Sequence, residues 1–307
     1  TEDFKLIKVI RGHEGEVRNV RFSVDGSKII SVSSDYTVRV WNVASGKQIQ
    51  VFQGNRGWMP FADFSPDNVI AVCLRNQTIE LCDIQSGKIL MKLEPHNHSI
   101  YNLNFSSDGK YIISSSFDRT IQLWDIESGK KIKQFEGGAI DISGVQFSSD
   151  GQKCLSFTHE AISIWDVQSG KRLRQLKAHS NNITCAKFSP NDEFIVSCSL
   201  DTTIRIWYIK SGRQFKKLEG HTNAVNEAKY FPDGQTIVSC SDDHTVRLWD
   251  VKTGEELQKL ERHSGPHHVL LIKQFEYGSD NTLFLKKLDE SSSDKKKQFI
   301  KFISVSS

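Results

Sequence analysis

The chain lacks several features that would assign it to common protein classes. No apolar run approaches the roughly 20 residues that a transmembrane helix needs, so the sequence predicts no membrane span. The formal net charge over 307 residues is only +3, which is too small to indicate nucleic-acid binding by itself. No secretory segment opens the chain, and its first residue is Thr1 rather than methionine. We therefore expect it to be a piece of a longer protein.

What the chain does contain is a segment that repeats. One copy begins at Gly220-His221 and ends at Trp249-Asp250, with Trp249 standing 28 residues after His221 and six after Asp243. The same two spacings recover three further sets, which are His13, Asp35 and Trp41; His96, Asp118 and Trp124; and His179, Asp201 and Trp207. Four sets in one register indicate a repeated structural unit.

A unit of about 40 to 45 residues that has Gly-His near its start and Trp-Asp at its end resembles the WD40-repeat family. The resemblance covers nearly the whole chain and implies an all-β, seven-bladed β-propeller with four-stranded antiparallel blades around a channel. Residues 1–288 then form one domain. Its units are about 4–46, 47–87, 88–129, 130–170, 171–212, 213–254 and 255–288.

The strand pattern within a unit agrees with this reading. Unit one contains four runs of strand-forming residues, VRNVRF, IISVSSD, TVRVW and KQIQVF. Asp25-Gly26 and Ser45-Gly46 stand between runs, as in tight turns. Glycine is expected there because such turns need a positive φ, which is costly for residues with a Cβ.

The two ends of the chain leave one question open. Phe4 to Ile10 alternates like a half-buried strand, and the resemblance implies that this strand joins the last blade and closes the ring. Residues 289–307 are a polar loop followed by a strand-like tail, QFIKFI, which competes for the same edge. Unit seven has Lys286 in place of tryptophan, so we expect the least regular blade there.

Serine, histidine and aspartate recur together, which raises the possibility of a hydrolase. Four copies argue against catalysis, because an enzyme needs one activated nucleophile. The resemblance implies instead four hydrogen-bonded structural tetrads, which are His13, Ser33, Asp35 and Trp41; His96, Ser116, Asp118 and Trp124; His179, Ser199, Asp201 and Trp207; and His221, Ser241, Asp243 and Trp249.

Other catalytic arrangements are not apparent either. The inner strands that would line a channel carry only two acidic residues, Asp63 and Glu227, so no paired carboxylates are predicted. The cysteines form no CxxC pair, and Cys73, Cys198 and Cys240 each stand nine residues before the tryptophan position of their units, as packing residues would. His263, His267 and His268 are interpreted as a surface loop. We expect no enzyme activity, metal or cofactor, and a reducing intracellular location, cytoplasmic with the nucleus left open.

Basic residues gather in the fourth strands of units three to five. These strands are outer edges, where lysine discourages edge-to-edge pairing. The alternative is that an anionic partner, nucleic acid or acidic lipid, binds this rim. The residues concerned are Lys130, Lys131, Lys133, Lys171, Arg172, Arg174, Lys177, Arg213, Lys216 and Lys217.

The family's partner-binding positions lie on the face formed by the loops that enter the first strand and join the second to the third. Carried over to this sequence, they are Glu16, Arg18, Ser34, Trp58, Pro60, Arg75, Ser99, Tyr101, Phe117, Asp141, Ser143, Thr158, Asn182, Thr184, Leu200, Ala224, Asn226 and Asp242. Aromatic side chains and arginine are common interface anchors. We therefore predict a non-catalytic adaptor for a protein or peptide partner, monomeric within a longer chain or complex.

An apolar patch in units two and three is the predicted centre of this face. Its members are Trp58, Pro60, Tyr101 and Phe117, with Arg18 and Arg75 at its border. A second interpretation of Trp58 is that it packs inward, because Cys82 stands where unit two lacks its tryptophan. The sequence leaves both interpretations open.

Overall fold

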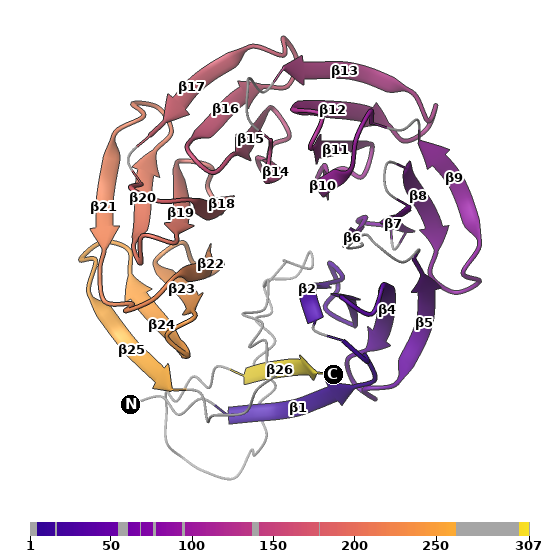
Figure 1. Ribbon diagram of the computed structural model, residues 1–307, viewed down its shortest axis with the longest axis horizontal. Helices are drawn as coiled ribbons and strands as arrows, with labels where there is room; N and C mark the ends of the chain where they lie inside the picture. Colours follow the sequence, from indigo (N-terminus) through magenta and orange to yellow (C-terminus); the bar gives the residue numbers. More distant parts are fainter. Residues whose placement is uncertain are drawn as a thin grey trace.

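The structure is a computed structural model that describes residues 5–15, 17–54, 61–67, 69–75, 78–93, 96–136, 141–177, 179–261 and 301–306. Its described residues form β-sheets that follow one another around a central axis, as in a propeller (Figure 1). No helix occurs within these ranges, and hence none long and apolar enough to cross a membrane. The all-β propeller expected from the repeat is therefore confirmed.

Six four-stranded antiparallel sheets are present in the described part of the chain. The first two contain β2 (Val17–Phe22), β3 (Lys28–Ser33), β4 (Thr37–Asn42) and β5 (Gln48–Gln53), and β6 (Phe61–Phe64), β7 (Val69–Arg75), β8 (Thr78–Asp83) and β9 (Ile89–Leu93). The next two contain β10 (Ile100–Phe105), β11 (Tyr111–Ser116), β12 (Thr120–Asp125) and β13 (Lys131–Glu136), and β14 (Gly144–Phe147), β15 (Lys153–Phe157), β16 (Ile162–Asp166) and β17 (Arg172–Leu176). The last two contain β18 (Ile183–Phe188), β19 (Phe194–Ser199), β20 (Ile204–Tyr208) and β21 (Gln214–Leu218), and β22 (Val225–Tyr230), β23 (Thr236–Ser241), β24 (Thr245–Asp250) and β25 (Glu256–Glu261).

The order of strands in each sheet follows the chain from the axis outward. The first strand faces the centre and the fourth lies on the rim (Figure 1). The middle strands are covered on both faces by neighbouring blades, so they are apolar or small almost throughout, whereas β17 exposes four of its five residues.

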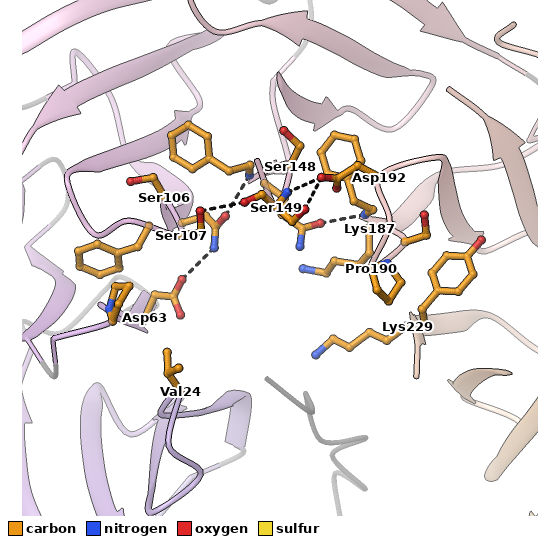
Figure 2. Close-up of a pocket in the computed structure, with 18 of the residues that line it drawn as sticks. Val24, Asp63, Ser106, Ser107, Ser148, Ser149, Lys187, Pro190, Asp192 and Lys229 are labelled. Carbon is orange, nitrogen blue, oxygen red and sulfur yellow. Dashed lines mark hydrogen bonds between the residues drawn. The ribbon is translucent and has the colours of Figure 1, made fainter. Parts of the chain in front are cut away.

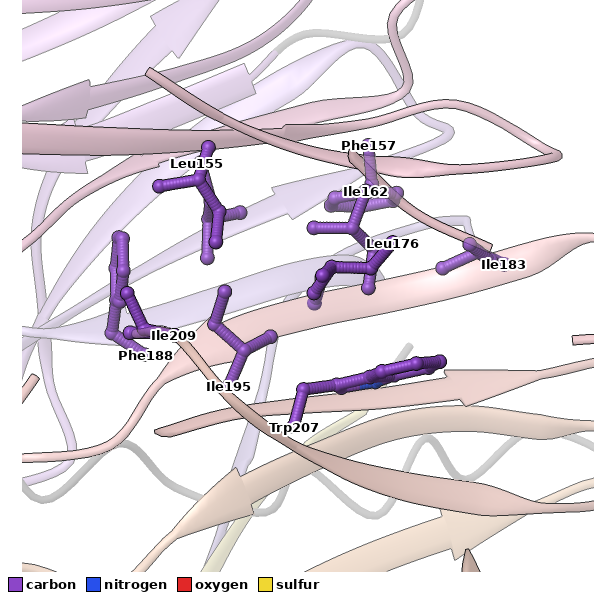
Figure 3. Close-up of a cluster of buried hydrophobic side chains, with 11 residues drawn as sticks. Leu155, Phe157, Ile162, Leu176, Ile183, Phe188, Ile195, Trp207 and Ile209 are labelled. Carbon is purple, nitrogen blue, oxygen red and sulfur yellow. The ribbon is translucent and has the colours of Figure 1, made fainter. Parts of the chain in front are cut away.

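The hydrophobic core is divided into layers between neighbouring blades. In one layer, Leu155 and Ile162 of the fourth sheet pack with Ile195 and Trp207 of the fifth (Figure 3). Blades therefore depend on their neighbours for burial, as in other repeat proteins.

The two terminal strands pair with each other, in parallel. The strand β1 (Lys5–Arg11) runs beside β26 (Lys301–Ser306), with Lys5 opposite Lys301 and Arg11 opposite Ser306. The sequence treated these segments as competitors for one edge, and the structure instead places them side by side. Residues 262–300, which hold Lys286, His263, His267 and His268, lie outside the described residues.

A contact between the rim of one blade and a turn of the next repeats around the ring. The turn glycine Gly212, with a φ of +71°, lies so close to Arg174 that an added Cβ would stand 3.2 Å from its Cδ. Arg174 Nη2 also donates a hydrogen bond to the backbone oxygen of Lys210 at 2.6 Å. Equivalent pairs are Gln50 with Gly87, Met91 with Gly129, Lys133 with Gly170, and Lys216 with Gly254. We call this contact the blade joint.

The blade joint engages part of the basic rim. Lys133 Nζ donates to the backbone oxygens of Val167 and Gln168, and Lys216 Nζ donates to that of Thr253 at 3.1 Å. These side chains lie against the protein rather than extending into solvent. Together with Arg174, these two lysines therefore hold neighbouring blades together.

Candidate functional site: the loop face and the channel

A buried hydrogen-bond chain links the entry loop of each complete unit to the second and third strands and to the turn between them. In the fifth sheet, His179 Nδ1 lies 2.9 Å from Asp201 Oδ2, and His179 Nε2 lies 2.8 Å from Ser197 Oγ. Trp207 Nε1 donates to the same Ser197 Oγ at 2.8 Å. The histidine, aspartate and tryptophan found by spacing lie in this chain in the other three units as well, where the serines are Ser31, Ser114 and Ser239.

The serine assigned from the sequence is wrong in all four tetrads. The expected residues Ser33, Ser116, Ser199 and Ser241 stand two positions further along the strand. Ser199 Oγ donates to the backbone oxygen of Asn181 at 3.0 Å and accepts from the amide of Asp201, so it fixes the turn. The reason is register: Trp207 stands opposite Ile195, and Ser197 is the next residue on that face of β19. Side chains alternate between the two faces of a strand, so serines two residues apart lie on the same face and the alternation does not distinguish them.

A threonine that the sequence analysis did not assign completes the chain. Thr203 Oγ1 donates to Asp201 Oδ1 at 2.6 Å, and the Thr203 amide donates to the same oxygen at 3.0 Å. Thr37, Thr120 and Thr245 make the same pair of bonds in their units. The signal was available as an Asp-X-Thr pattern in all four units.

The protonation of the tetrads follows from burial and hydrogen bonding. Burial raises the pKa of Asp35, but donors from Thr37, Glu14 and His13 outweigh it and lower the pKa to about 2. Burial is the main reason that the pKa of His13 is lowered, although Asp35 opposes that effect. The imidazole is therefore neutral and donates from Nδ1 to the carboxylate, while its Nε2 accepts the proton of Ser31. Because Ser31 is fully buried, a substrate has no access to it.

Replacing Trp207 by phenylalanine should lower the free energy of unfolding by about 1–3 kcal/mol. The change removes the indole donor to Ser197 and leaves the buried packing partly in place. Urea denaturation followed by circular dichroism measures this difference. Tyr208→Phe is the control, because Tyr208 lies on the same strand but is 40% exposed. Equal stability of Trp207→Phe and wild type would mean that the indole bond contributes nothing.

Two aromatic side chains stack on the loop face. The rings of Tyr101 and Phe117 have centroids 4.0 Å apart and planes inclined by 22°. The exposed His98 contacts Phe117 at 5.6 Å between centroids. Tyr101 and Phe117 are half-buried, so the stack presents part of its surface to solvent. A rigid aromatic pair can bury a large area at small entropic cost when a partner covers it.

Opposite charges border the aromatic stack. Arg119 Nε lies 3.8 Å from Asp141 Oδ1, and both side chains are well exposed. Arg119 follows the tetrad aspartate with a φ of 68°, a left-handed conformation that the turn imposes on a residue with a Cβ. Burial and the Asp141 carboxylate both raise the pKa of Tyr101. We call Tyr101, Phe117, His98, Arg119 and Asp141 the aromatic patch; His98 and Arg119 were not among the residues predicted from the sequence.

The other predicted face residues fall into separate groups. Arg18, Ser143, Thr184 and Asn226 line a cavity in the channel, whereas Ser99 and Ala224 are buried. Those that remain at least partly exposed are Ser34, Thr158, Asn182, Leu200 and Asp242. Glu16, Trp58 and Pro60, together with the side chain of Arg75, lie outside the described part of the chain.

Two cavities formed by described residues of the channel share a pair of lysines. One has a volume of about 460 Å³ and the other of about 230 Å³, and Lys187 and Lys229 line both. Figure 2 shows these lysines on one side of the larger cavity and Asp63 on the other. The acids noted from the sequence, Asp63 and Glu227, do line the channel, and basic residues of the inner strands, Arg21, Lys187 and Lys229, line it as well. Across the described residues, no group of three or more potential metal ligands is assembled.

Comparison with known proteins gives the relationship of the chain to others. A family profile described as "WD domain, G-beta repeat" matches residues 4–42, 87–125, 170–208 and 212–250. The chain is 32% identical over 109 residues to nuclear distribution protein PAC1 of Candida dubliniensis, covering 34% of the chain and 22% of that protein. It is 29% identical over 124 residues to guanine nucleotide-binding protein subunit beta of Arabidopsis thaliana, covering 37% and 33%.

A third relative is eukaryotic translation initiation factor 3 subunit I of Phaeosphaeria nodorum, which is 31% identical over 106 residues, or 34% of this chain and 31% of that protein. In each of the three, the match spans between about a fifth and a third of the relative's own length. These similarities are to the repeat itself.

Proposed function

Because the chain belongs to the WD40-repeat family, we propose that it is a non-catalytic adaptor that presents its loop face to a protein or peptide. The observation that carries this proposal is the aromatic patch. It combines a stacked Tyr101 and Phe117 with an exposed ion pair at its edge. Apolar anchors surrounded by charged groups are typical of interfaces between proteins. Two of the relatives are named as subunits, which supports a role within a complex.

The complete ring, in this proposal, has seven blades and closes through its N-terminal strand. The strand β1 lies on the rim between β25 and β5, with β26 on its inner side (Figure 1). Ile10 of β1 is buried with Val17 and Trp41 of the first sheet, as a rim strand of the preceding blade would be. The seventh blade would then contain both chain ends, joined in the β1–β26 pair.

An intracellular location is part of the same proposal. The described cysteines Cys82, Cys154, Cys185, Cys198 and Cys240 are free, and the first four are buried. Burial raises the pKa of Cys82 to about 11, so this thiol stays protonated and unreactive at neutral pH. Buried free thiols are typical of proteins kept in a reducing compartment.

The double substitution Tyr101→Ala and Phe117→Ala should reduce recovery of direct binding partners by about tenfold or more, since anchor residues each contribute roughly 2 kcal/mol. The measurement is affinity purification from cell extract with quantitative mass spectrometry, using wild type and variant at equal amounts. Thermal unfolding of the purified variant checks that the ring is intact.

Tyr208→Ala is the matched control. Tyr208 also contacts a phenylalanine, Phe194, with centroids 4.7 Å apart, and it is 40% exposed. It lies on β20, away from the loop face, so its loss should leave the partners unchanged. The proposal fails if the double variant folds normally and recovers the same partners in the same amounts as wild type.

A further inference from the structure

We propose that the central channel binds a small phosphate-bearing anion between Lys187, Lys229 and Arg21. These residues come from the inner strands β18, β22 and β2, which are distant in sequence and meet at the axis (Figure 1). All three line the cavity of about 230 Å³. Neither the family relationship nor the adaptor function assigns a ligand to this place.

The geometry brings the cationic groups to the narrow part of the channel. Lys187 and Lys229 line both cavities, so they lie where the two meet. Figure 2 shows both amino groups extending from the wall toward the centre of the channel. An anion entering from either face of the ring would therefore reach the same two lysines.

The carboxylates of the channel neutralise only part of this charge. Asp63 Oδ1 lies 3.5 Å from Arg21 Nε, and Asp63 Oδ2 accepts a hydrogen bond from the side-chain Nδ2 of Asn104. Glu227 Oε1 lies 2.9 Å from Lys229 Nζ. Among the described residues, no carboxylate lies within 4 Å of Lys187 Nζ, and Arg18 adds a further cation at the cavity wall. Lys187 is therefore the cation of this cavity for which the described carboxylates provide no close counter-charge, and a bound phosphate group would provide one.

Lys187 is held under electrostatic strain that an anion would relieve. Burial lowers the pKa of Lys187, and the positive charges of Arg21 and Lys229 lower it further, while Cys185 and Glu227 oppose them. A buried cation beside like charges is costly unless it has a counter-charge. Binding of a phosphate would supply that counter-charge and raise the pKa of Lys187 toward its ordinary value.

Neutral hydrogen-bonding groups complete the cavity wall. Ser143 Oγ is buried and has no hydrogen-bond partner in the described structure, and it lines this cavity together with Thr184 and Asn226. Hydroxyl and amide donors beside lysine and arginine suit the several oxygens of a phosphate group. The volume is below the roughly 300–1,000 Å³ of drug-sized ligand sites, which favours a small anion such as pyrophosphate over a nucleotide.

Calorimetric titration of the chain with inorganic pyrophosphate, at constant ionic strength adjusted with sodium chloride, tests the proposal. Wild type should bind one equivalent, and Lys187→Gln should bind about tenfold more weakly, as expected when one charge-assisted bond is lost. Lys187→Arg keeps the charge and should retain binding. Lys130→Gln removes an exposed lysine outside the channel and is the matched control.

A second measurement uses the unaltered protein. Acylation of lysines, mapped by mass spectrometry, should slow at Lys187 and Lys229 when pyrophosphate is added, and stay unchanged at Lys130. Because Lys187→Gln also removes a repulsive charge, its melting temperature without anion should equal or exceed that of wild type. Absence of saturable binding to wild type, equal binding by Lys187→Gln, or unprotected channel lysines would each overturn the proposal.

Discussion

Replacing Asp201 by alanine should lower the free energy of unfolding by about 4 kcal/mol, because the loss of a buried charged partner typically costs 3–5 kcal/mol. Its carboxylate accepts four hydrogen bonds, from His179 Nδ1, the Ser180 amide, and the amide and hydroxyl of Thr203. Alanine leaves these donors without their acceptor in a place that water hardly reaches. The bonds act together, so the cost is less than their sum. Urea unfolding monitored by circular dichroism gives the difference.

The matched control for this substitution is Asp242→Ala. Asp242 directly precedes a tetrad aspartate in the next unit but is exposed, and its carboxylate accepts a side-chain bond from Asn226. Substitutions of that kind usually change stability by about 0.5 kcal/mol or less. If Asp201→Ala and Asp242→Ala destabilised the protein equally, the tetrad would have no special role in stability.

Lowering the pH should reduce the free energy of unfolding in two stages. The pKa values of His13, His179 and His221 are lowered, chiefly by burial, so the unfolded state binds protons first. The contribution of these histidines to the free energy of unfolding is complete above the ordinary histidine pKa of 6.5. It is lost as the pH falls through their pKa values in the folded protein. Stability should therefore begin to decline near pH 6.5, before any carboxylate is protonated.

The second stage belongs to the tetrad aspartates. Burial raises their pKa values, but the hydrogen bonds that they accept prevail and lower all four, Asp35 to about 2. The contribution of these aspartates to the free energy of unfolding is complete above the ordinary aspartate pKa of 3.8. It is lost as the pH falls through their pKa values in the folded protein. For Asp35 alone the loss is about 2 kcal/mol. Urea midpoints measured from pH 8 to pH 2 at constant ionic strength show the profile. Stability that does not change between pH 5 and pH 2 would contradict this account.

Spacing in the sequence predicted the fold because the repeat is set by residues that bond to each other. The histidine, aspartate and tryptophan of each complete unit keep fixed intervals, since each must reach the next across paired strands. The serine could not be assigned in this way. Ser197 and Ser199 lie on the same face of one strand, and only the register against Trp207 decides between them.

The aromatic patch and the channel show what the sequence left out. Tyr101 and Phe117 were expected on one face, but their stacking depends on how β10 and the turn after β11 meet within one blade, and the Arg119–Asp141 pair depends on how that blade meets the next. The channel cations come from strands up to about 200 residues apart in the chain, so no local pattern signals that they meet. Counting both signs of charge along all inner strands would have found them.

The blade joint makes the ring directional. Each repeat supplies the long rim side chain for the blade that follows it and the glycine turn for the blade that precedes it, and successive glycines such as Gly170 and Gly212 are 42 residues apart. Such head-to-tail association, with different surfaces on the two sides of each subunit, closes only when the rotation per unit divides a full circle. A repeat added by tandem duplication would carry both the rim side chain and the glycine turn of the blade joint, so it could form this contact with each of its neighbours. The number of blades is therefore governed by the rotation at each blade joint.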